Sequence, residues 1–169
     1  MQNSAKKPVA IITGASRGVG AATALLLASK GWNVTITCSS TIKEAKEVAK
    51  ACETFDVEAL AIQADVSDDT DCKNTIEQTV KKWGRIDALI NNAGTTKFAW
   101  DHSNLDLLDA EDFQKVYGVN LIGPFQMIKA SKEFLMKSDN PSITNVSSIA
   151  GIKGIGSSIA YAASKGALN

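Results

Sequence analysis

The first thirty residues set the strongest limit on how this chain folds. A short apolar run at residues 9–13 passes directly into a glycine-rich stretch, and an Ala/Leu-rich segment of helical period follows at 18–30. Val- and Ile-rich runs alternate with helical segments in the same way along the rest of the chain. Because parallel strands need crossover connections, this order predicts an α/β protein with a doubly wound parallel sheet, which binds ligands at the carboxyl ends of its strands.

The pattern predicts five strands, at residues 9–13, 33–38, 58–63, 86–91 and 142–146, and four helices, at 18–30, 42–55, 68–83 and 109–137. Asp68 or Asp69 can cap the third helix. In the fourth helix Pro124 has no N–H, so we expect a kink that leaves the carbonyl of Asn120 free to hold a water or another donor. A kink that only lets the helix follow the sheet is the alternative.

The charge balance excludes several classes of partner. The chain has 169 residues, with 18 Lys and Arg against 18 Asp and Glu, 44% hydrophobic residues and 21% charged residues. It lacks the basic excess of a nucleic-acid-binding protein and the composition of a disordered one. No apolar run reaches the roughly 18 residues of a membrane span, and the first residues do not resemble a signal peptide, so we expect a cytoplasmic protein. We expect one domain at 8–169 after a tail at 1–7.

The cysteines and the histidine give no sign of a metal or redox centre. Cys38, Cys52 and Cys72 fit neither a C-x-x-C pair nor a zinc module, and their odd number argues against a disulfide framework. His102 has no second His or Cys nearby, so we predict no metal site. A Ser-His-Asp hydrolase is disfavoured because it would have to use His102, the one histidine of the sequence, as its base.

The glycine-rich stretch from Thr13 to Gly20 is a candidate phosphate-binding turn. Glycines there let backbone N–H groups and the positive end of the following helix approach a pyrophosphate. The spacing is G-x-x-x-G-x-G rather than the common G-x-G-x-x-G, and a tight turn that uses its glycines for packing alone is the alternative. The residues predicted to hold the cofactor here are Gly14, Ser16, Arg17, Gly18, Val19 and Gly20.

The end of the second strand indicates which dinucleotide binds. An Asp or Glu about 20 residues past the glycines normally holds the adenosine ribose, but Ser39 and Ser40 stand there, and the first carboxylate comes only at Glu44. Arg17, Lys43 and the two serine hydroxyls suit a 2′-phosphate, so NADP(H) is favoured over NAD(H). Solvated surface charges are the alternative reading of the two cations.

Tyr161 and Lys165 stand four residues apart, so a helix would carry the phenol and the ammonium on one face. A phenol with a pKa of about 10 is a poor acid or base at neutral pH, and a nearby ammonium stabilises its anion and lowers that pKa. We expect this helix to begin no earlier than Ser157 or Ser158. Ser148 follows the last predicted strand, where its hydroxyl either binds a substrate carbonyl or belongs to a turn.

In their order along the chain, these motifs resemble the short-chain dehydrogenase/reductase family. The resemblance covers nearly the whole chain after residue 7 and implies a Rossmann fold. It implies that Tyr161 is the general acid/base, that Ser148 orients the substrate carbonyl, and that Lys165 binds the nicotinamide ribose and lowers the phenol pKa. Asn120 would hold a water in a proton relay. The further cofactor contacts that it implies are Asp65 and Val66 beside the adenine, and Asn92, Ala93 and Gly94 at the end of the fourth strand.

One departure from the family is large. The family pattern continues past the lysine, whereas this sequence ends at Asn169, so we expect the carboxyl-terminal strands to be missing and the fifth strand to form an exposed edge. The loop at 95–108 is longer than in compact members, and we expect it to shape the rim of the site.

The predicted function is an NADP(H)-dependent oxidoreductase that interconverts a small carbonyl compound and an alcohol by hydride transfer. A truncated, inactive dinucleotide-binding module is the alternative. An epimerase or dehydratase of the extended family type is disfavoured, because those members resemble G-x-x-G-x-x-G at the first turn. We expect a small-molecule substrate, no nucleic-acid or membrane partner, and a homo-oligomer in the full-length form.

Overall fold

The computed structural model describes residues 7–169 and confirms the predicted doubly wound α/β architecture. Five parallel strands form one sheet in the order β3-β2-β1-β4-β5. The strands are β1 (Val9–Ile12), β2 (Asn33–Cys38), β3 (Ala59–Gln63), β4 (Ala88–Asn91) and β5 (Ser142–Asn145). The chain changes from one side of β1 to the other between β3 and β4, so the carboxyl ends of β1 and β4 form the switch point where such sheets bind ligands. Of the tail expected at 1–7, all but Lys7 lies outside the described residues.

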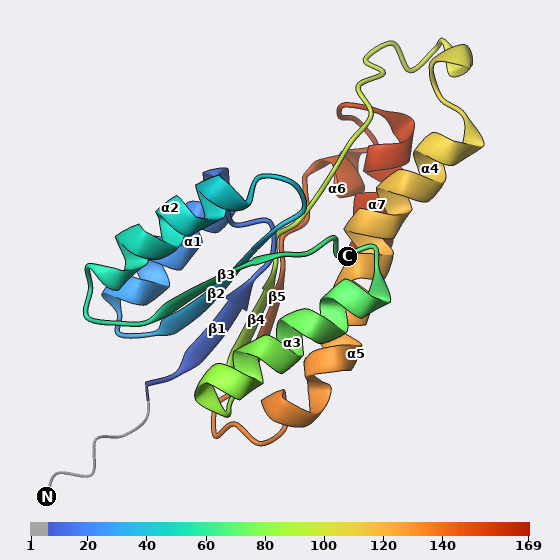
Figure 1. The fold of residues 1–169 in the computed structure, drawn as a ribbon. Helices are drawn as coiled ribbons and strands as arrows, with labels where there is room; N and C mark the ends of the chain where they lie inside the picture. Colours follow the sequence, from blue (N-terminus) through green and yellow to red (C-terminus); the bar gives the residue numbers. More distant parts are fainter. Residues whose placement is uncertain (1–6) are drawn as a thin grey trace, which may run out of the picture.

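Helices cover both faces of the sheet (Figure 1). The helices are α1 (Gly18–Ser29), α2 (Ile42–Glu53), α3 (Asp69–Trp83), α4 (Ala110–Tyr117), α5 (Gly123–Leu135), α6 (Ala150–Lys153) and α7 (Ile159–Leu168). α1 and α2 lie on one face, and α3 and α5 lie on the other. The side chains of β1 alternate between the two cores, since Ala10 and Ile12 pack toward α1 and α2 and Ile11 packs toward α3 and α5. All residues of β1 and β2 are buried, as expected for strands covered on both faces.

The third helix begins as the sequence predicts. Asp68 Oδ1 accepts hydrogen bonds from the backbone N–H of Thr70 (2.6 Å) and Asp71 (3.4 Å), and so caps the amino end of α3. These bonds lower the pKa of the Asp68 carboxyl. Gly84 ends the helix with a φ of 76°, a conformation that glycine adopts without steric cost.

The helix predicted at 109–137 is interrupted, as the expected kink requires, but over a longer stretch than a single proline kink. It is divided into α4, a π-helical segment at Gly118–Ile122, and α5. In the π segment the N–H of Gly123 bonds to the carbonyl of Gly118, five residues back. Pro124 follows in the first turn of α5 and has no N–H to continue a regular helix, so the expected interruption takes the form of a wide turn. This turn places the side chain of Asn120 in a fully buried position.

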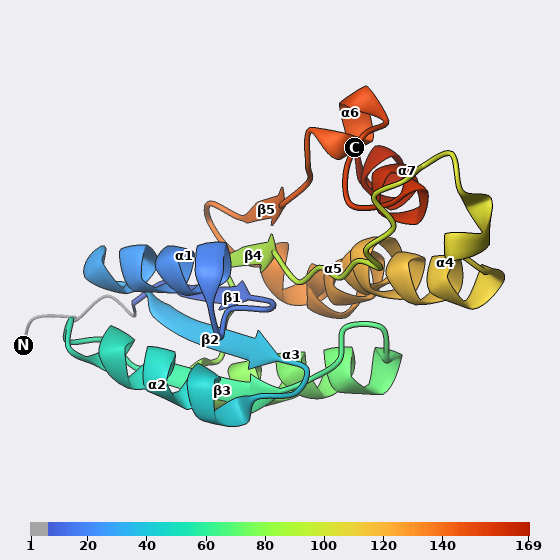
Figure 2. The ribbon, with the colours of Figure 1, turned by 90° about the horizontal axis from the view of Figure 1, so that it is seen from above.

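The last part of the chain lies beyond the carboxyl ends of the strands, where α6 and α7 follow β5 (Figure 2). α7 begins at Ile159, and Ser158 Oγ accepts the N–H of Tyr161 at 3.1 Å, in agreement with the predicted start. The single turn of α6 and a 3₁₀ turn at Leu105–Leu107 were not predicted, because such short elements carry no periodic signal. All four residues of β5 are exposed, and this strand forms one edge of the sheet.

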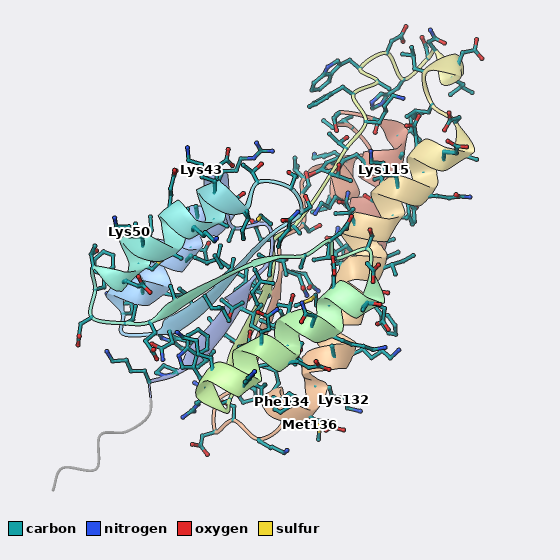
Figure 3. The ribbon with its side chains drawn as sticks, in the orientation of Figure 1. Lys43, Lys50, Lys115, Lys132, Phe134 and Met136 are labelled. Carbon is teal, nitrogen blue, oxygen red and sulfur yellow. The ribbon has the colours of Figure 1, made fainter. Side chains whose placement is uncertain are left out.

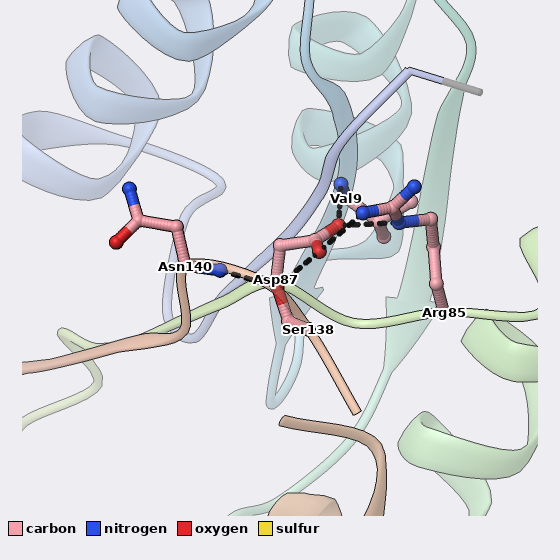
Figure 4. A network of polar contacts seen from close by, with 5 residues as sticks. All are labelled: Val9, Arg85, Asp87, Ser138 and Asn140. Atoms are coloured by element: carbon pink, nitrogen blue, oxygen red, sulfur yellow. Dashed lines mark hydrogen bonds and ion pairs between the residues drawn. The ribbon is translucent and has the colours of Figure 1, made fainter. Parts of the chain in front are cut away.

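A buried carboxylate holds the amino end of the sheet together (Figure 4). Asp87, just before β4, is 3% exposed. Its Oδ2 accepts the N–H of Val9 and Nε of Arg85, both at 2.8 Å, and its Oδ1 accepts Oγ of Ser138 at 2.6 Å. This network therefore joins the starts of β1 and β4 to the segment that enters β5.

Cys38, Cys52 and Cys72 are free and buried. Burial raises the pKa of the Cys52 thiol to about 11 and that of Cys72 to about 12, so both are poor nucleophiles at neutral pH. No helix within residues 7–169 has the length and apolar character needed to cross a bilayer.

Candidate active site

The turn after β1 contains glycines of two kinds. A Cβ on Gly14 would lie 2.8 Å from Cα of Ala93, and a Cβ on Gly20 would lie 2.5 Å from Nδ2 of Asn92. These two glycines are therefore required for packing, in line with the alternative reading of the motif. A Cβ on Gly18 would meet no atom of residues 7–169 within 4 Å, although its φ of 58° favours glycine. Gly18 thus leaves open space beside the turn.

Asn92 and Thr13 clamp the turn onto the end of β4. Asn92 Nδ2 donates to the carbonyls of Thr13 (2.8 Å) and Gly14 (3.0 Å). In return, Thr13 Oγ1 accepts the backbone N–H groups of Asn92 and Ala93, both at 3.0 Å. The Asn92 side chain is thus engaged with the protein backbone, and Thr13 is a positioning residue that the motif analysis did not single out.

A cleft of about 450 Å³ runs along this turn and is called the turn cleft here. Most of the residues predicted to hold the cofactor line it: Gly14, Ser16, Arg17, Ser39, Ser40, Asp65, Val66, Asn92, Ala93 and Gly94. Arg17 is the N-cap of α1 but makes no capping bond with its side chain, and the first turn of α1 contains no acidic residue. The N–H groups at this helix end therefore suit an anionic group, and the cleft fits the phosphates of a dinucleotide.

The far end of the turn cleft differs from the expectation in two residues. Among the described residues, Glu44 lines it, whereas Lys43 does not. Lys43 lies at the start of α2 (Figure 3). Glu44, in the first turn of α2, thus adds an acidic residue to the cleft that Arg17, Ser39 and Ser40 line. From the sequence, Glu44 stood too far past the second strand to be predicted as part of the cofactor site.

Asp65 and Val66 follow β3, as the resemblance requires. Asp65 is exposed, and its Oδ1 accepts the backbone N–H (2.9 Å) and the Oγ (2.7 Å) of Ser67. Val66 is buried, and its carbonyl accepts Nε2 of Gln126 at 2.8 Å. Both residues are therefore held in place by their own loop and by α5. Lys115 of α4, which is labelled in Figure 3, also lines the cleft and was not predicted.

A second cavity of about 520 Å³ contains Tyr161 and Lys165 and is called the tyrosine cavity here. Lys165 is 4% exposed, and its Nζ lies 5.9 Å from the centroid of the Tyr161 ring. The same Nζ donates to the carbonyl of Val146 at 2.8 Å. Desolvation by burial lowers the pKa of Lys165. The predicted pairing of phenol and ammonium on one helix face is therefore present.

Ser148 lies near this cavity but is engaged in a turn. Its Oγ accepts the backbone N–H of Ala150 at 3.1 Å, at the start of α6. The described residues that line the tyrosine cavity include Ser147 but not Ser148. This contact matches the alternative reading of Ser148 as a turn residue.

Asn120 connects three parts of the site. Its Oδ1 accepts the N–H of Thr95 at 2.8 Å, and its Nδ2 donates to the carbonyl of Thr95 at 3.0 Å. Nδ2 also donates to Oγ of Ser164 at 2.9 Å. The side chain thus ties the π segment to the loop after β4 and to α7, next to Lys165. Thr95 and Ser164 were not predicted, because nothing in their local pattern distinguishes them.

The two cavities adjoin each other. Asn92, Gly94 and Thr95 line both, and these residues follow β4 at the switch point of the sheet. A ligand that extends from the turn after β1 to Tyr161 would therefore cross the end of β4.

The family model for short chain dehydrogenases matches residues 8–169. The chain belongs to the short-chain dehydrogenase family. Similar family members include ketoacyl reductase 2 of the granaticin polyketide synthase of Streptomyces violaceoruber, which is 38% identical over 159 residues and 94% of this chain. A 3-oxoacyl-[acyl-carrier-protein] reductase of Synechocystis is 37% identical over 93% of this chain. This chain spans 62% of the length of each of these two relatives.

Solved structures of short-chain dehydrogenases have the same fold. A Burkholderia xenovorans protein described as a short-chain dehydrogenase/reductase matches with a TM-score of 0.92 and 46% identity, over 96% of this chain and 68% of that one. A xylitol dehydrogenase bound to NAD⁺ matches with a TM-score of 0.86 and 30% identity, over 95% of this chain and 60% of that one.

Proposed function

We propose that this short-chain dehydrogenase is an NADP(H)-dependent oxidoreductase that interconverts a carbonyl compound and an alcohol, with Tyr161 as the general acid/base. The observation that carries the proposal is that Tyr161 and Lys165 share a cavity that adjoins the turn cleft through Asn92, Gly94 and Thr95. The relatives support it, since two are named as reductases of ketoacyl groups and one solved neighbour is a dehydrogenase bound to NAD⁺.

The residues at the turn and switch point would hold the cofactor. In this proposal the N–H groups at the start of α1 bind the pyrophosphate, and Asp65 and Val66 lie beside the adenine. Ala93 and Gly94 would lie against the nicotinamide ribose, and Tyr161 and Lys165 would help to hold it. The nicotinamide supplies or accepts the hydride.

The chain itself supplies the proton. Tyr161 donates its phenolic proton to the carbonyl oxygen during reduction and accepts one from the alcohol during oxidation. The ammonium of Lys165 lies 5.9 Å from the centroid of the Tyr161 ring, beside the group that exchanges the proton. Ser148 orients the carbonyl, which requires its hydroxyl to turn from the Ala150 N–H toward the cavity. Asn120 holds a water that relays protons to Lys165.

The role of Tyr161 is tested by Tyr161→Phe. The variant should bind NADPH as well as the parent chain does, because only the hydroxyl is lost, and its ketone reduction should fall by about 10² to 10⁴. Tyr117→Phe is the matched control, since Tyr117 lies on α4 and is not among the described residues of either cavity. Turnover within a factor of three of the parent would make Tyr161 structural. NADPH binding without any turnover by the parent chain would support a dinucleotide-binding module instead.

The cofactor preference is tested at the far end of the turn cleft. NADPH should bind about fivefold tighter than NADH, or more, and Arg17→Glu should abolish this preference by repelling the 2′-phosphate.

Glu44→Gln should raise NADPH affinity about two- to fivefold, because it removes a carboxylate from the same cleft. Lys43→Gln is the control, because Lys43 does not line the cleft. Equal affinities for the two cofactors in the parent, measured by nucleotide fluorescence, would contradict the preference.

A further inference from the structure

The loop after β4 presents two large aromatic side chains. Phe98 is 66% exposed and Trp100 is 71% exposed, whereas Ala99 between them is 4% exposed. This alternation is that of an extended segment, which directs residues two apart to the same side. The two rings are stacked with their centroids 5.4 Å apart and an interplanar angle of 28°.

This aromatic pair has a fixed position relative to Tyr161. The N–H of Ala99 donates to the carbonyl of Ser157 at 2.7 Å, and the hydroxyls of Thr96 and Ser157 are 2.6 Å apart. His102 Nε2 lies 3.1 Å from the carbonyl of Gly156. Ser157 directly precedes the cap of α7, the helix that carries Tyr161. The loop is therefore attached at several points to the segment that leads into the helix of the reacting residue.

Phe98 and Trp100 line the tyrosine cavity together with Tyr161. Exposed aromatic rings of this size are costly in water, and a contiguous apolar surface at the rim of a cavity is typical of a ligand-binding wall. Here the wall stands beside the phenol to which the proposed function assigns the proton transfer.

The charges around the cavity favour an uncharged ligand. Among the described residues that line it, Lys165 is the one cation and there is no acidic residue. Lys165 is buried and donates to the carbonyl of Val146 at 2.8 Å. Lys97, beside Phe98, forms an ion pair with Asp112 at 3.1 Å. A carboxylate or phosphate on the substrate would therefore have to compete with these partners for a cation.

We propose that Phe98 and Trp100 are specificity-determining residues that select a carbonyl substrate with a flat, uncharged aromatic ring next to the reacting carbon, that is, an aryl ketone. The inference rests on the proposed function, because it places the ring relative to the carbonyl that Tyr161 protonates. An aromatic ring gains offset-stacked or edge-to-face contact with both side chains, which a saturated ring of equal size does not.

The test compares two ketones of the same size. Acetophenone and cyclohexyl methyl ketone differ in the aromaticity of the ring, and their dissociation constants for the whole chain are measured by ligand-observed NMR, with and without NADPH. We expect acetophenone to bind about fivefold tighter. The double variant Phe98→Leu/Trp100→Leu keeps the apolar bulk and should reduce this preference to less than twofold. Because both side chains are exposed, the double variant should melt at the parent's temperature.

The control is Phe125→Ala, which removes a ring that is 64% exposed on α5, outside the tyrosine cavity, and should keep the preference. Equal affinity of the parent for the two ketones would overturn the inference. The inference would also be overturned if the double variant kept the preference for acetophenone. A double variant that sediments differently but binds both ketones as the parent does would show that Phe98 and Trp100 form a contact between copies of the chain, which would overturn it too.

The binding readout separates this inference from the proposed function. If the parent chain does not bind NADPH, the proposed function fails. The preference for the aromatic ring can still be measured in that case, because ketone binding is also recorded without the cofactor. Reduction of both ketones at equal rates with equal affinities would leave the proposed function in place and overturn the aromatic selectivity.

Discussion

At the scale of single residues, Lys165 has a proposed role in function but lowers the stability of the fold. Its ammonium is buried, with the carbonyl of Val146 as its hydrogen-bond acceptor, and desolvation lowers its pKa. A buried charge without an ionic partner costs folding free energy. The proposed chemistry at Tyr161 supplies a reason for this cost.

The prediction is that Lys165→Met leaves the chain within about 1 kcal/mol of the parent's stability at pH 7, or more stable, while NADPH affinity falls. The unfolded lysine binds its proton more tightly than the folded one, so the parent's stability should rise as the pH increases through the lowered folded pKa toward the ordinary value of 10.5. The variant should lack this rise. Urea denaturation at a series of pH values from 7 to 10.5 measures the difference.

Lys153→Met serves as the control, because Lys153 is exposed in α6. Its stability should follow the pH dependence of the parent. If Lys165→Met shows the same rise between neutral and alkaline pH as the parent, the lowered pKa is not the cause.

At the scale of elements, the turn between β1 and α1 combines two demands. Gly14 and Gly20 let the turn pack against the end of β4, and Gly18 leaves open space at the start of α1. The glycine motif therefore serves the fold and the ligand at different positions, although the spacing alone presents the three glycines as equivalent.

We predict that Gly20→Ala destabilises the chain by about 2 to 3 kcal/mol without any cofactor, because its Cβ would meet backbone atoms of Ala15 and Gly14 at 2.8 Å. Gly18→Ala should cost only about 1 kcal/mol, the penalty of a left-handed conformation, since no atom of the described part of the chain lies within 4 Å of the added carbon. Thermal melting of both apo variants tests the contrast. A Gly20→Ala chain that melts like the parent and loses only NADPH affinity would contradict the packing role.

At the scale of the whole molecule, one end of the sheet forms the candidate binding site and the other end contains a stabilising polar network. The carboxyl ends of β1, β2, β3 and β4 form the turn cleft, whereas the amino ends of β1 and β4 are joined by the Asp87 network (Figure 4). Burial tends to raise the pKa of the Asp87 carboxyl, but hydrogen bonds from Arg85, Ser138 and the N–H of Val9 outweigh it, and the pKa lies below its ordinary value.

Asp87→Asn should therefore cost about 3 kcal/mol of stability at pH 7 and leave NADPH affinity unchanged. In the parent, the stabilisation by this carboxylate is fully present above the unfolded pKa of 3.8 and is lost as the pH falls through the lower folded value. The variant should lose less stability between pH 5 and acid pH, as measured by urea denaturation. Asp139→Asn is the control, since Asp139 is exposed; an equal loss in both variants would show that burial is not the cause.

The features that could be predicted from the sequence are those whose cause is local. The strand-turn-helix at the start, the cap of α3 by Asp68, the start of α7 after Ser158 and the pairing of Tyr161 with Lys165 all depend on residues a few positions apart. Backbone propensity, capping and helical period act over such distances, so the sequence alone determines them. The alternation of strands and helices left few possible topologies, which is why the doubly wound parallel sheet could also be predicted, whereas the strand order came from the structure.

Other features depended on the tertiary structure. Asn92 clamps Thr13 across 79 residues of sequence, Phe98 and Trp100 are placed by bonds to Ser157, and Glu44 rather than Lys43 lines the turn cleft. Each depends on the direction in which a side chain points after distant elements have packed, and no local pattern encodes that direction. The sequence by itself therefore determined the family, the sheet and the candidate acid/base pair, whereas packing between distant segments decided which side chains hold the turn, line the clefts and form the rim.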